Sequence, residues 1–263
     1  MLKYFSISII AALAMSMSAF ANDLVVVVGG TGQTGWETVK EAVAQGYKVR
    51  ATTTNVDRAR ESKGEDGFTW VKMDARILDD IRAAFIGADY VISTLGGSCY
   101  DPGGPRSPRY VDFQGVVNMA GISKDYGVKQ FVLTSALGAG LPDQPLNQFC
   151  DNVQVWKWLG EDYLRDGDLP YTIIRPGGLG TDEGGKQGIA MAGIGGLKGK
   201  AGEIQRADVA KVLVEVLGNQ GALGKTIAIG GDSNSRPDEW RDTFSDLPVD
   251  GAQAPPFQRG QGE

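Results

Sequence analysis

Histidine is absent from this chain of 263 residues. Its absence excludes a Ser-His-Asp or Cys-His nucleophile system, and it excludes any metal site that uses a histidine ligand. The two cysteines, Cys99 and Cys150, are too few and too far apart in the sequence to form a zinc site. Hydrolase and metalloenzyme functions are therefore not expected, and we expect no metal.

Clustered positive charge and long apolar runs are also missing. The formal net charge is −6 and there is no run of basic residues, which argues against nucleic acid as a partner. The longest apolar run, Tyr4 to Met17, is short for a membrane span of about 20 residues. Hydrophobic residues make up 42% of the chain, enough for one sizeable core, so we expect a single domain.

The first 21 residues have the pattern of a cleavable export signal. A short basic start, Met1-Leu2-Lys3, precedes the apolar run, and Ala19 and Ala21 occupy the small-residue positions before the cleavage site. We expect the folded domain to span 22–247 in the periplasm or a secretory lumen. An uncleaved anchor is one alternative. An algal plastid is another, because Ser18-Ala19-Phe20 resembles the cleavage-site motif of diatom plastid proteins.

At the other end, residues 248–263 are rich in proline, glycine and glutamine. This composition predicts a disordered tail.

The most informative stretch runs from Val25 to Gly35. Four β-branched valines predict a buried strand, and glycines follow it with the spacing Gly29-x-x-Gly32-x-x-Gly35, before a helix-compatible stretch at 36–45. Glycine allows positive φ and close approach of the backbone to a pyrophosphate, and a helix N-terminus presents N–H groups to that anion. Strand, glycine turn and helix together predict a dinucleotide-binding unit.

Beyond this unit the sequence alternates between strand and helix patterns. The further strands are expected at 48–53, 68–73, 90–95, 130–135, 171–174 and 225–229. The further helices are expected at 78–85, 111–126, 153–165 and 206–217. Such alternation predicts an α/β fold, a Rossmann-type doubly wound parallel sheet with helices on both faces. The glycine-rich segment 177–202 is expected to form a mobile loop over the site.

Several motifs in order carry a family resemblance. They are Gly29-Gly30-Thr31-Gly32-Gln33-Thr34-Gly35, Val111-Asp112-Phe113-Gln114-Gly115-Val116, 127–135, Trp156-Lys157, 169–179 and 204–210. With these motifs the chain resembles an atypical short-chain dehydrogenase/reductase of the NAD(P)-binding, NmrA-like kind, from Leu24 to about Asp232. The resemblance implies a nicotinamide cofactor whose pyrophosphate is bound by Gly29, Thr31, Gly32, Gln33, Thr34 and Gly35.

The end of the second strand bears on the choice between NADP and NAD. In NAD-preferring folds an acid at this place binds the ribose hydroxyls, but Arg50-Ala51-Thr52-Thr53-Thr54-Asn55 contains no carboxylate. Arg50 and Arg58 could bind a 2′-phosphate, with Thr53 and Thr54 as hydroxyl donors. Alternatively, both arginines are solvated surface charges, and NADP-using relatives often carry arginine where this chain has Thr54. We expect NADP, with NAD as the alternative.

The resemblance assigns three further groups of cofactor contacts. Asp74-Ala75 match the position that contacts adenine, and Leu95-Gly96-Gly97 should pass beneath the cofactor. Pro176-Gly177-Gly178 should set the nicotinamide end through backbone groups.

Catalysis is where the chain departs from the family pattern. The better-known members use serine, tyrosine and lysine, with the tyrosine four residues before the lysine as proton donor. Ser135 and Lys157 stand at the matching places, but the tyrosine place is Val153. Tyr100 and Tyr110 could replace the missing donor or only pack their loop. Ser135 and Lys157 could also be no more than a strand-end hydroxyl and a surface lysine.

A cofactor pocket without a proton donor suits hydride transfer to a flavin, quinone or similar aromatic acceptor. Protons can then come from water, and the protein supplies orientation and exclusion of solvent. We therefore expect an NADPH-dependent reductase of an aromatic acceptor. The alternative is a non-catalytic NADP-binding regulator or scaffold whose ligand changes its affinity for a protein partner.

Cys99 and Cys150 both fall in segments that this fold brings to the carboxyl edge of the sheet. An oxidising compartment would favour a disulfide between them if their Cα atoms lie within about 7 Å. Two unrelated thiols are the favoured interpretation, and a bridge is the alternative.

Overall fold

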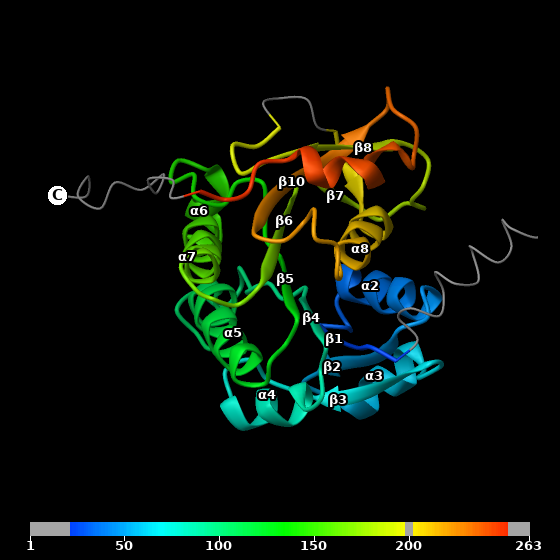
Figure 1. The fold of residues 1–263 in the computed structure, drawn as a ribbon. Helices are drawn as coiled ribbons and strands as arrows, with labels where there is room; N and C mark the ends of the chain where they lie inside the picture. Colours follow the sequence, from blue (N-terminus) through cyan, green and yellow to red (C-terminus); the bar gives the residue numbers. More distant parts are fainter. Residues whose placement is uncertain (1–21, 198–201, 252–263) are drawn as a thin grey trace, which may run out of the picture.

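The structure, a computed structural model, describes residues 22–197 and 202–251. Its centre is an eight-stranded sheet in the order β3-β2-β1-β4-β5-β6-β10-β8, parallel except for β8, which runs antiparallel to β10 (Figure 1). The strands are β1 (Leu24–Val28), β2 (Lys48–Thr53), β3 (Phe68–Lys72), β4 (Tyr90–Ser93), β5 (Gln130–Thr134), β6 (Tyr171–Pro176), β8 (Gly188–Ala192) and β10 (Lys225–Asp232). The predicted Rossmann-type sheet is confirmed.

Helices cover both faces of this sheet, as predicted (Figure 1). On one face lie α2 (Gln33–Ala44), α3 (Val56–Lys63) and α8 (Arg206–Glu215). On the other lie α4 (Leu78–Phe85), α5 (Gly115–Asp125) and α7 (Val153–Arg165), with the short α6 (Pro145–Phe149) before α7. A π-helical turn, η1 (Arg109–Gln114), leads into α5, and a 3-10 segment, η2 (Glu239–Asp246), follows β10.

The valine strand β1 shows why both faces are covered. Successive side chains of a strand point to opposite faces, so Val25 joins the core beneath α2 and α8, while Val26 joins the core beneath α4 and α5. Both side chains are fully buried. A strand buried on both faces needs apolar residues at every position, and four consecutive valines meet that requirement.

Helix α3 was not foreseen from the sequence. Only one of its residues, Ala59, is buried, so it has no apolar periodicity to reveal it. Its start is fixed instead by the side chain of Asn55, whose Oδ1 accepts a hydrogen bond from the Arg58 N–H at 3.0 Å.

The glycine-rich segment 177–202 was expected to be a mobile loop, and this prediction is wrong for its described part. It contains β7 (Leu179–Gly180), which pairs with β9 (Ile204–Gln205), and the edge strand β8. β8 pairs with the glycine-containing end of β10, where Gly230 lies opposite Ala190. Such pairing depends on a strand about 40 residues away, so the local composition did not reveal it.

The structure describes little of the two predicted end segments. The expected export signal, 1–21, and residues 252–263 lie outside the described residues. Within the predicted tail, Asp250 is held in place: its carboxylate accepts hydrogen bonds from Thr226 N at 3.0 Å, Thr226 Oγ1 at 2.6 Å and Tyr171 Oη at 3.1 Å. Within 22–197 and 202–251, no helix has the length and apolarity needed to cross a membrane.

Candidate functional site

The glycine turn after β1 has the geometry of a phosphate-binding loop. Gly29 has φ of +81°, which favours glycine, and a Cβ on Gly35 would lie 2.1 Å from the Gly29 carbonyl oxygen. The residues Gly32, Gln33, Thr34 and Gly35 form the start of α2, where Gly32 is the N-cap and no side chain caps the helix. No acidic residue lies in its first turn. The helix start can therefore accept an anion on its backbone N–H groups.

A cavity of about 430 Å³ opens beside this turn, at the carboxyl ends of the strands. It lies where the strand order reverses between β1 and β4, the place at which open α/β sheets bind ligands. Predicted residues that line it are Gly29, Thr31, Thr53, Thr54, Asp74, Ala75, Leu95 and Gly96. The structure thus gathers residues from four separate loops around one space large enough for part of a nucleotide.

Arg50 does not belong to this cavity, and its prediction as a phosphate ligand is corrected. Its Nη1 donates to the carbonyl oxygens of Ala84 at 2.6 Å and Ile86 at 2.9 Å, at the end of α4. Burial lowers the pKa of this guanidinium. Arg50 satisfies helix-end carbonyls, which is a common use of a basic side chain.

The other predicted phosphate ligands lie near the end of β2. Thr53 is buried and Thr54 is exposed on the cavity wall. Arg58 is an exposed residue in the first turn of α3, outside the cavity lining. The structure therefore joins the two threonines to the cavity and leaves Arg58 out of its lining.

Two arginines that the sequence reading missed do line the cavity, Arg76 and Arg106. Arg76 forms an ion pair with Asp74 through both its Nε and its Nη2, and its Nη1 donates to Pro105 O at 2.9 Å. The hydrogen bonds from Arg76 hold the pKa of Asp74 below its ordinary value. Arg106 keeps most of its side chain in solvent. The signal that could have found Arg76 was its place just past a strand end.

Lys157 and a buried carboxylate meet at the end of the cavity near β4 and β5. Lys157 Nζ lies 2.5 Å from Asp112 Oδ1, and the Gly97 N–H donates to Asp112 Oδ2 at 2.8 Å. The Asp112 side chain is 2% exposed and that of Lys157 is 15% exposed. Both residues line a small cavity together with Ser135, which follows β5. The structure thus brings Ser135 and Lys157 together and adds Asp112, a residue of the motif 111–116 for which the sequence predicted no role.

The position of the missing tyrosine is also clear. Val153 is the first residue of α7, one turn before Lys157, and it is buried. The two candidate substitutes do not line either cavity: Tyr100 is 95% exposed, and Tyr110 is partly exposed beside Arg109. Tyr100 therefore does not pack its loop.

A family model described as NAD(P)H-binding matches residues 29–220, more than half of the chain. The chain belongs to this NAD(P)H-binding family. The match begins at the first glycine of the phosphate loop and includes every residue that lines the larger cavity except Val28.

Relatives and solved structures agree with this assignment. The chain is 38% identical to sanguinarine reductase of Eschscholzia californica over 133 residues, covering 50% of this chain and 48% of that protein. It is 32% identical to the chloroplastic protein TIC 62 of Pisum sativum over 177 residues, covering 60% of this chain and 33% of that protein. The chain thus spans half or less of these relatives. A structure from Bacillus halodurans, described as a NAD-dependent epimerase/dehydratase, has a TM-score of 0.70 and 27% identity, covering 80% and 95% of the two chains.

The nicotinamide end of this NAD(P)H-binding protein was assigned to Pro176-Gly177-Gly178. The structure places these residues at the end of β6, where Gly177 N donates to Ile229 O at 2.9 Å and Gly178 O accepts from Ile204 N at 2.8 Å. They are tied to β10 and β9 and line neither of the two cavities described above. Their contact with a nicotinamide stays a prediction.

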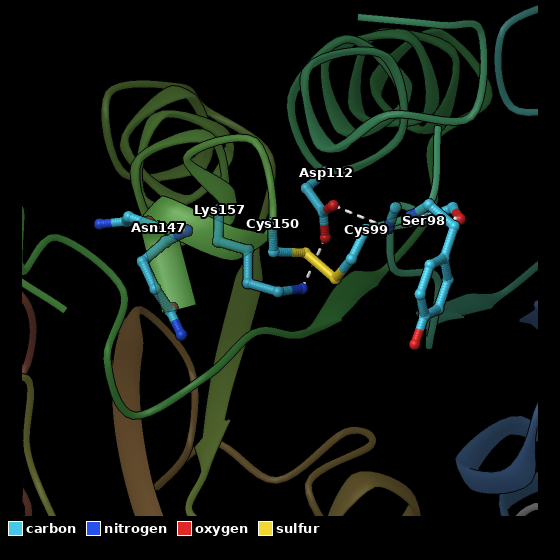
Figure 2. Close-up of a disulfide and its surroundings, with 9 residues drawn as sticks. Ser98, Cys99, Asp112, Asn147, Cys150 and Lys157 are labelled. Carbon is cyan, nitrogen blue, oxygen red and sulfur yellow. Dashed lines mark hydrogen bonds and ion pairs between the residues drawn. A yellow bond between two sulfur atoms is a disulfide. The ribbon is translucent and has the colours of Figure 1, made fainter. Parts of the chain in front are cut away.

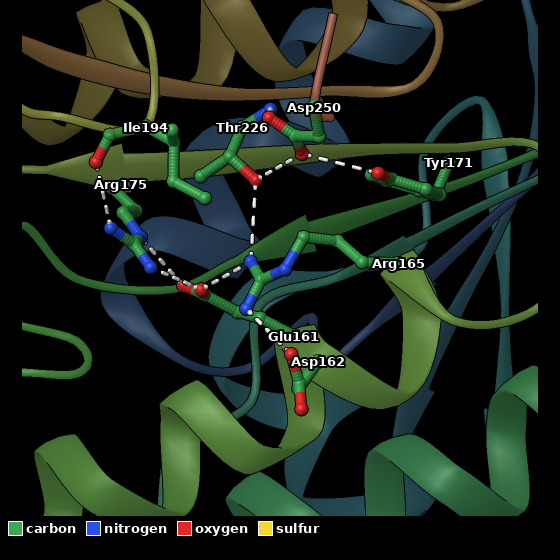
Figure 3. A network of polar contacts seen from close by, with 8 residues as sticks. All are labelled: Glu161, Asp162, Arg165, Tyr171, Arg175, Ile194, Thr226 and Asp250. Atoms are coloured by element: carbon green, nitrogen blue, oxygen red, sulfur yellow. Dashed lines mark hydrogen bonds and ion pairs between the residues drawn. The ribbon is translucent and has the colours of Figure 1, made fainter. Parts of the chain in front are cut away.

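A buried ionic network supports the helix that carries Lys157 (Figure 3). Glu161, one turn further along α7, is fully buried and accepts bonds from Arg175 Nε at 2.9 Å, Arg175 Nη2 at 2.5 Å and Arg165 Nη1 at 2.9 Å. Burial by itself raises the pKa of Glu161, but Arg175, Arg165 and the Ser135 hydroxyl outweigh it and lower the pKa. Arg165 continues the network to Thr226, which bonds Asp250.

Cys99 and Cys150 form a disulfide, with Cα atoms 4.2 Å apart (Figure 2). This finding corrects the favoured interpretation of two unrelated thiols. It joins the loop after β4 to the connection between α6 and α7, and Asp112 and Lys157 are among the residues around it.

Proposed function

We propose that this protein is an NADPH-dependent reductase of a flavin, a quinone or a similar aromatic acceptor. The observation that carries the proposal is the pairing of Lys157 with buried Asp112 beside the nucleotide cavity, with a valine where a proton-donating tyrosine would stand. The names of relatives such as sanguinarine reductase support a reductase rather than a hydrolase or lyase.

The chain's own residues fit a nicotinamide cofactor, which would supply a hydride when bound. The start of α2 would hold the pyrophosphate on N–H groups, and Asp74-Ala75 would contact the adenine. Lys157 would donate to ribose hydroxyls, while Asp112 fixes the position of its ammonium group. Ser135 would orient the acceptor from the end of β5. None of these residues is required to donate a proton, so acceptors that take protons from water are favoured.

Preference for NADPH over NADH is supported by the charges around the cavity. Thr54 and Asn55, which directly follow β2, are not acidic, so the ribose hydroxyl acceptor of NAD-preferring folds is absent from the strand end. The one carboxylate among the cavity-lining residues, Asp74, is paired with Arg76, and Arg106, which pairs with Asp101 outside the lining, adds a second guanidinium. Guanidinium groups pair well with phosphate oxygens.

Two measurements test this proposal. Calorimetric titration should give tighter binding of NADPH than of NADH, and Arg106→Ala should weaken NADPH binding more than NADH binding. The matched control is Arg82→Ala, an exposed arginine of α4 that pairs with Asp79, which should change neither affinity. Equal affinities for the two cofactors would refute the phosphate preference.

Steady-state NADPH oxidation should then be measured with riboflavin, a benzoquinone and a planar iminium alkaloid, against an aliphatic ketone. We expect turnover of the aromatic acceptors and none of the ketone. Tight NADPH binding without turnover of any acceptor would instead favour the alternative function, a cofactor-responsive regulator that binds a protein partner.

We further propose that residues 1–21 are a targeting signal. The signal would direct the protein either to the periplasm or a secretory lumen, or to a plastid. The chloroplastic relative supports the plastid destination. Mass spectrometry of protein purified from its source should find an N-terminus near Asn22, and an intact Met1 would contradict the proposal.

A further inference from the structure

The disulfide is one of two links between the same pair of segments. Cys99 and Cys150 are 51 residues apart in sequence, and close by the Gly103 N–H donates to Asp151 Oδ2 at 3.0 Å. The loop that follows β4 is therefore fastened to the segment before α7 by the disulfide seen in Figure 2 and by this hydrogen bond.

The two sulfur-bearing residues differ in access to solvent. Cys99 is exposed, whereas Cys150 is 2% exposed. Tyr100 and Phe149, the neighbours of the two cysteines, are also exposed. Thiol–disulfide exchange begins with attack of an incoming thiolate on the accessible sulfur, so Cys99 is the sulfur open to attack and Cys150 is the leaving group.

Each end of the bridge lies a few residues along the chain from a group that positions the Lys157–Asp112 pair. On the Cys99 side, Gly97 lies two residues earlier, and its N–H holds Asp112 Oδ2. On the Cys150 side, α7 begins three residues later and carries Lys157 one turn on.

The backbone between Cys150 and α7 has an uncommon conformation. Asp151 has φ of 46° and Asn152 has φ of 55°, two consecutive left-handed residues that are not glycine. Such conformations persist where the surrounding structure holds them. The disulfide and the Asp151–Gly103 bond are the contacts that hold these residues to the β4 loop.

We propose that the Cys99–Cys150 bridge is a site of reversible reduction by a dithiol, and that its reduction weakens cofactor binding. A dithiol thiolate forms a mixed disulfide with Cys99 and releases Cys150 as a thiolate that takes a proton. The second thiol of the reductant then displaces Cys99, so one disulfide and one dithiol become two thiols and one oxidised dithiol. With the bridge open, Gly97 no longer keeps Asp112 in place, and Lys157 loses its fixed position. Only the effect on the cofactor rests on the proposed function.

Two readouts on the full chain test this inference. Hydrogen exchange should show faster exchange at Gly97 and Gly103 after treatment with dithiothreitol, with thiol labelling confirming a change from no free thiols to two. Calorimetry should show that NADPH binds about tenfold more weakly to the reduced protein, the size expected for the loss of one charge-assisted hydrogen bond.

The control is Cys99→Ser combined with Cys150→Ser, which should match the reduced protein in both readouts and be unaffected by dithiothreitol. Unchanged exchange at Gly97 and Gly103 on reduction would overturn the inference, as would equal NADPH affinity in the two states. If neither state binds NADPH, the proposed function fails and so does the coupling to the cofactor, while hydrogen exchange still shows whether the bridge orders the loop.

Discussion

Replacement of Glu161 by glutamine should destabilise the protein strongly. The carboxylate is fully buried and receives three hydrogen bonds from two arginines. Glutamine keeps one acceptor oxygen but removes the negative charge, so buried Arg175 loses its counterion and Arg165 keeps only Asp162. Breaking a buried ion pair costs about 3–5 kcal/mol. Because one oxygen is retained, we expect Glu161→Gln to lower the unfolding free energy by about 3 kcal/mol.

The assay is chemical denaturation followed by fluorescence, together with a thermal scan. For a domain of this size, about 3 kcal/mol corresponds to a fall in Tm of about 6–12 °C. The matched control is Asp162→Asn, the next residue of α7, which is partly exposed and lies 3.6 Å from Arg165. Its effect should stay within about 1 kcal/mol. A Glu161→Gln protein within 1 kcal/mol of the wild type would refute the reasoning.

The pH dependence of stability gives a second check on the same residue. The pKa of Glu161 in the folded state lies below its ordinary value, so its ionised form stabilises the fold. This contribution is fully present above the unfolded-state pKa of about 4.3, and it is lost as the pH falls through the lower folded-state pKa. The difference in unfolding free energy between wild type and Glu161→Gln should therefore be constant from neutral pH to about 4.3 and narrow below it.

Three further substitutions test separate parts of the structure. Gly35→Ala places a methyl group against the Gly29 carbonyl, so we expect the unfolding free energy to fall by about 1–3 kcal/mol. Calorimetry should also show weaker NADPH binding, and unchanged binding would contradict the phosphate-loop assignment. Arg50→Ala removes two hydrogen bonds to helix-end carbonyls and should lower the unfolding free energy by about 1–2 kcal/mol. NADPH affinity should stay unchanged, and a marked loss of affinity would support Arg50 as a phosphate ligand. Asp250→Ala removes three hydrogen bonds and should lower the unfolding free energy by about 2–3 kcal/mol; no loss would mean that the segment after 247 does not contribute to the fold.

The sequence by itself determined the sheet, most of its strands and helices, and the phosphate loop. These features depend on local chemistry: consecutive valines require a strand buried on both faces, and a glycine-rich turn before a helix provides a place for an anion. Lys157 and Ser135 followed from family motifs at fixed spacings.

Only the tertiary structure decided which side chains meet. Arg50 bonds carbonyls 34 and 36 residues away, while Arg76 lines the cavity from another strand end. Asp112 pairs with Lys157 across 45 residues, and Cys99 reaches Cys150 across 51. The partner of a polar side chain depends on where distant segments pass one another. Local composition does not predict these partners. An arginine or carboxylate can be solvated or form an ion pair, and a thiol can stay free or form a disulfide.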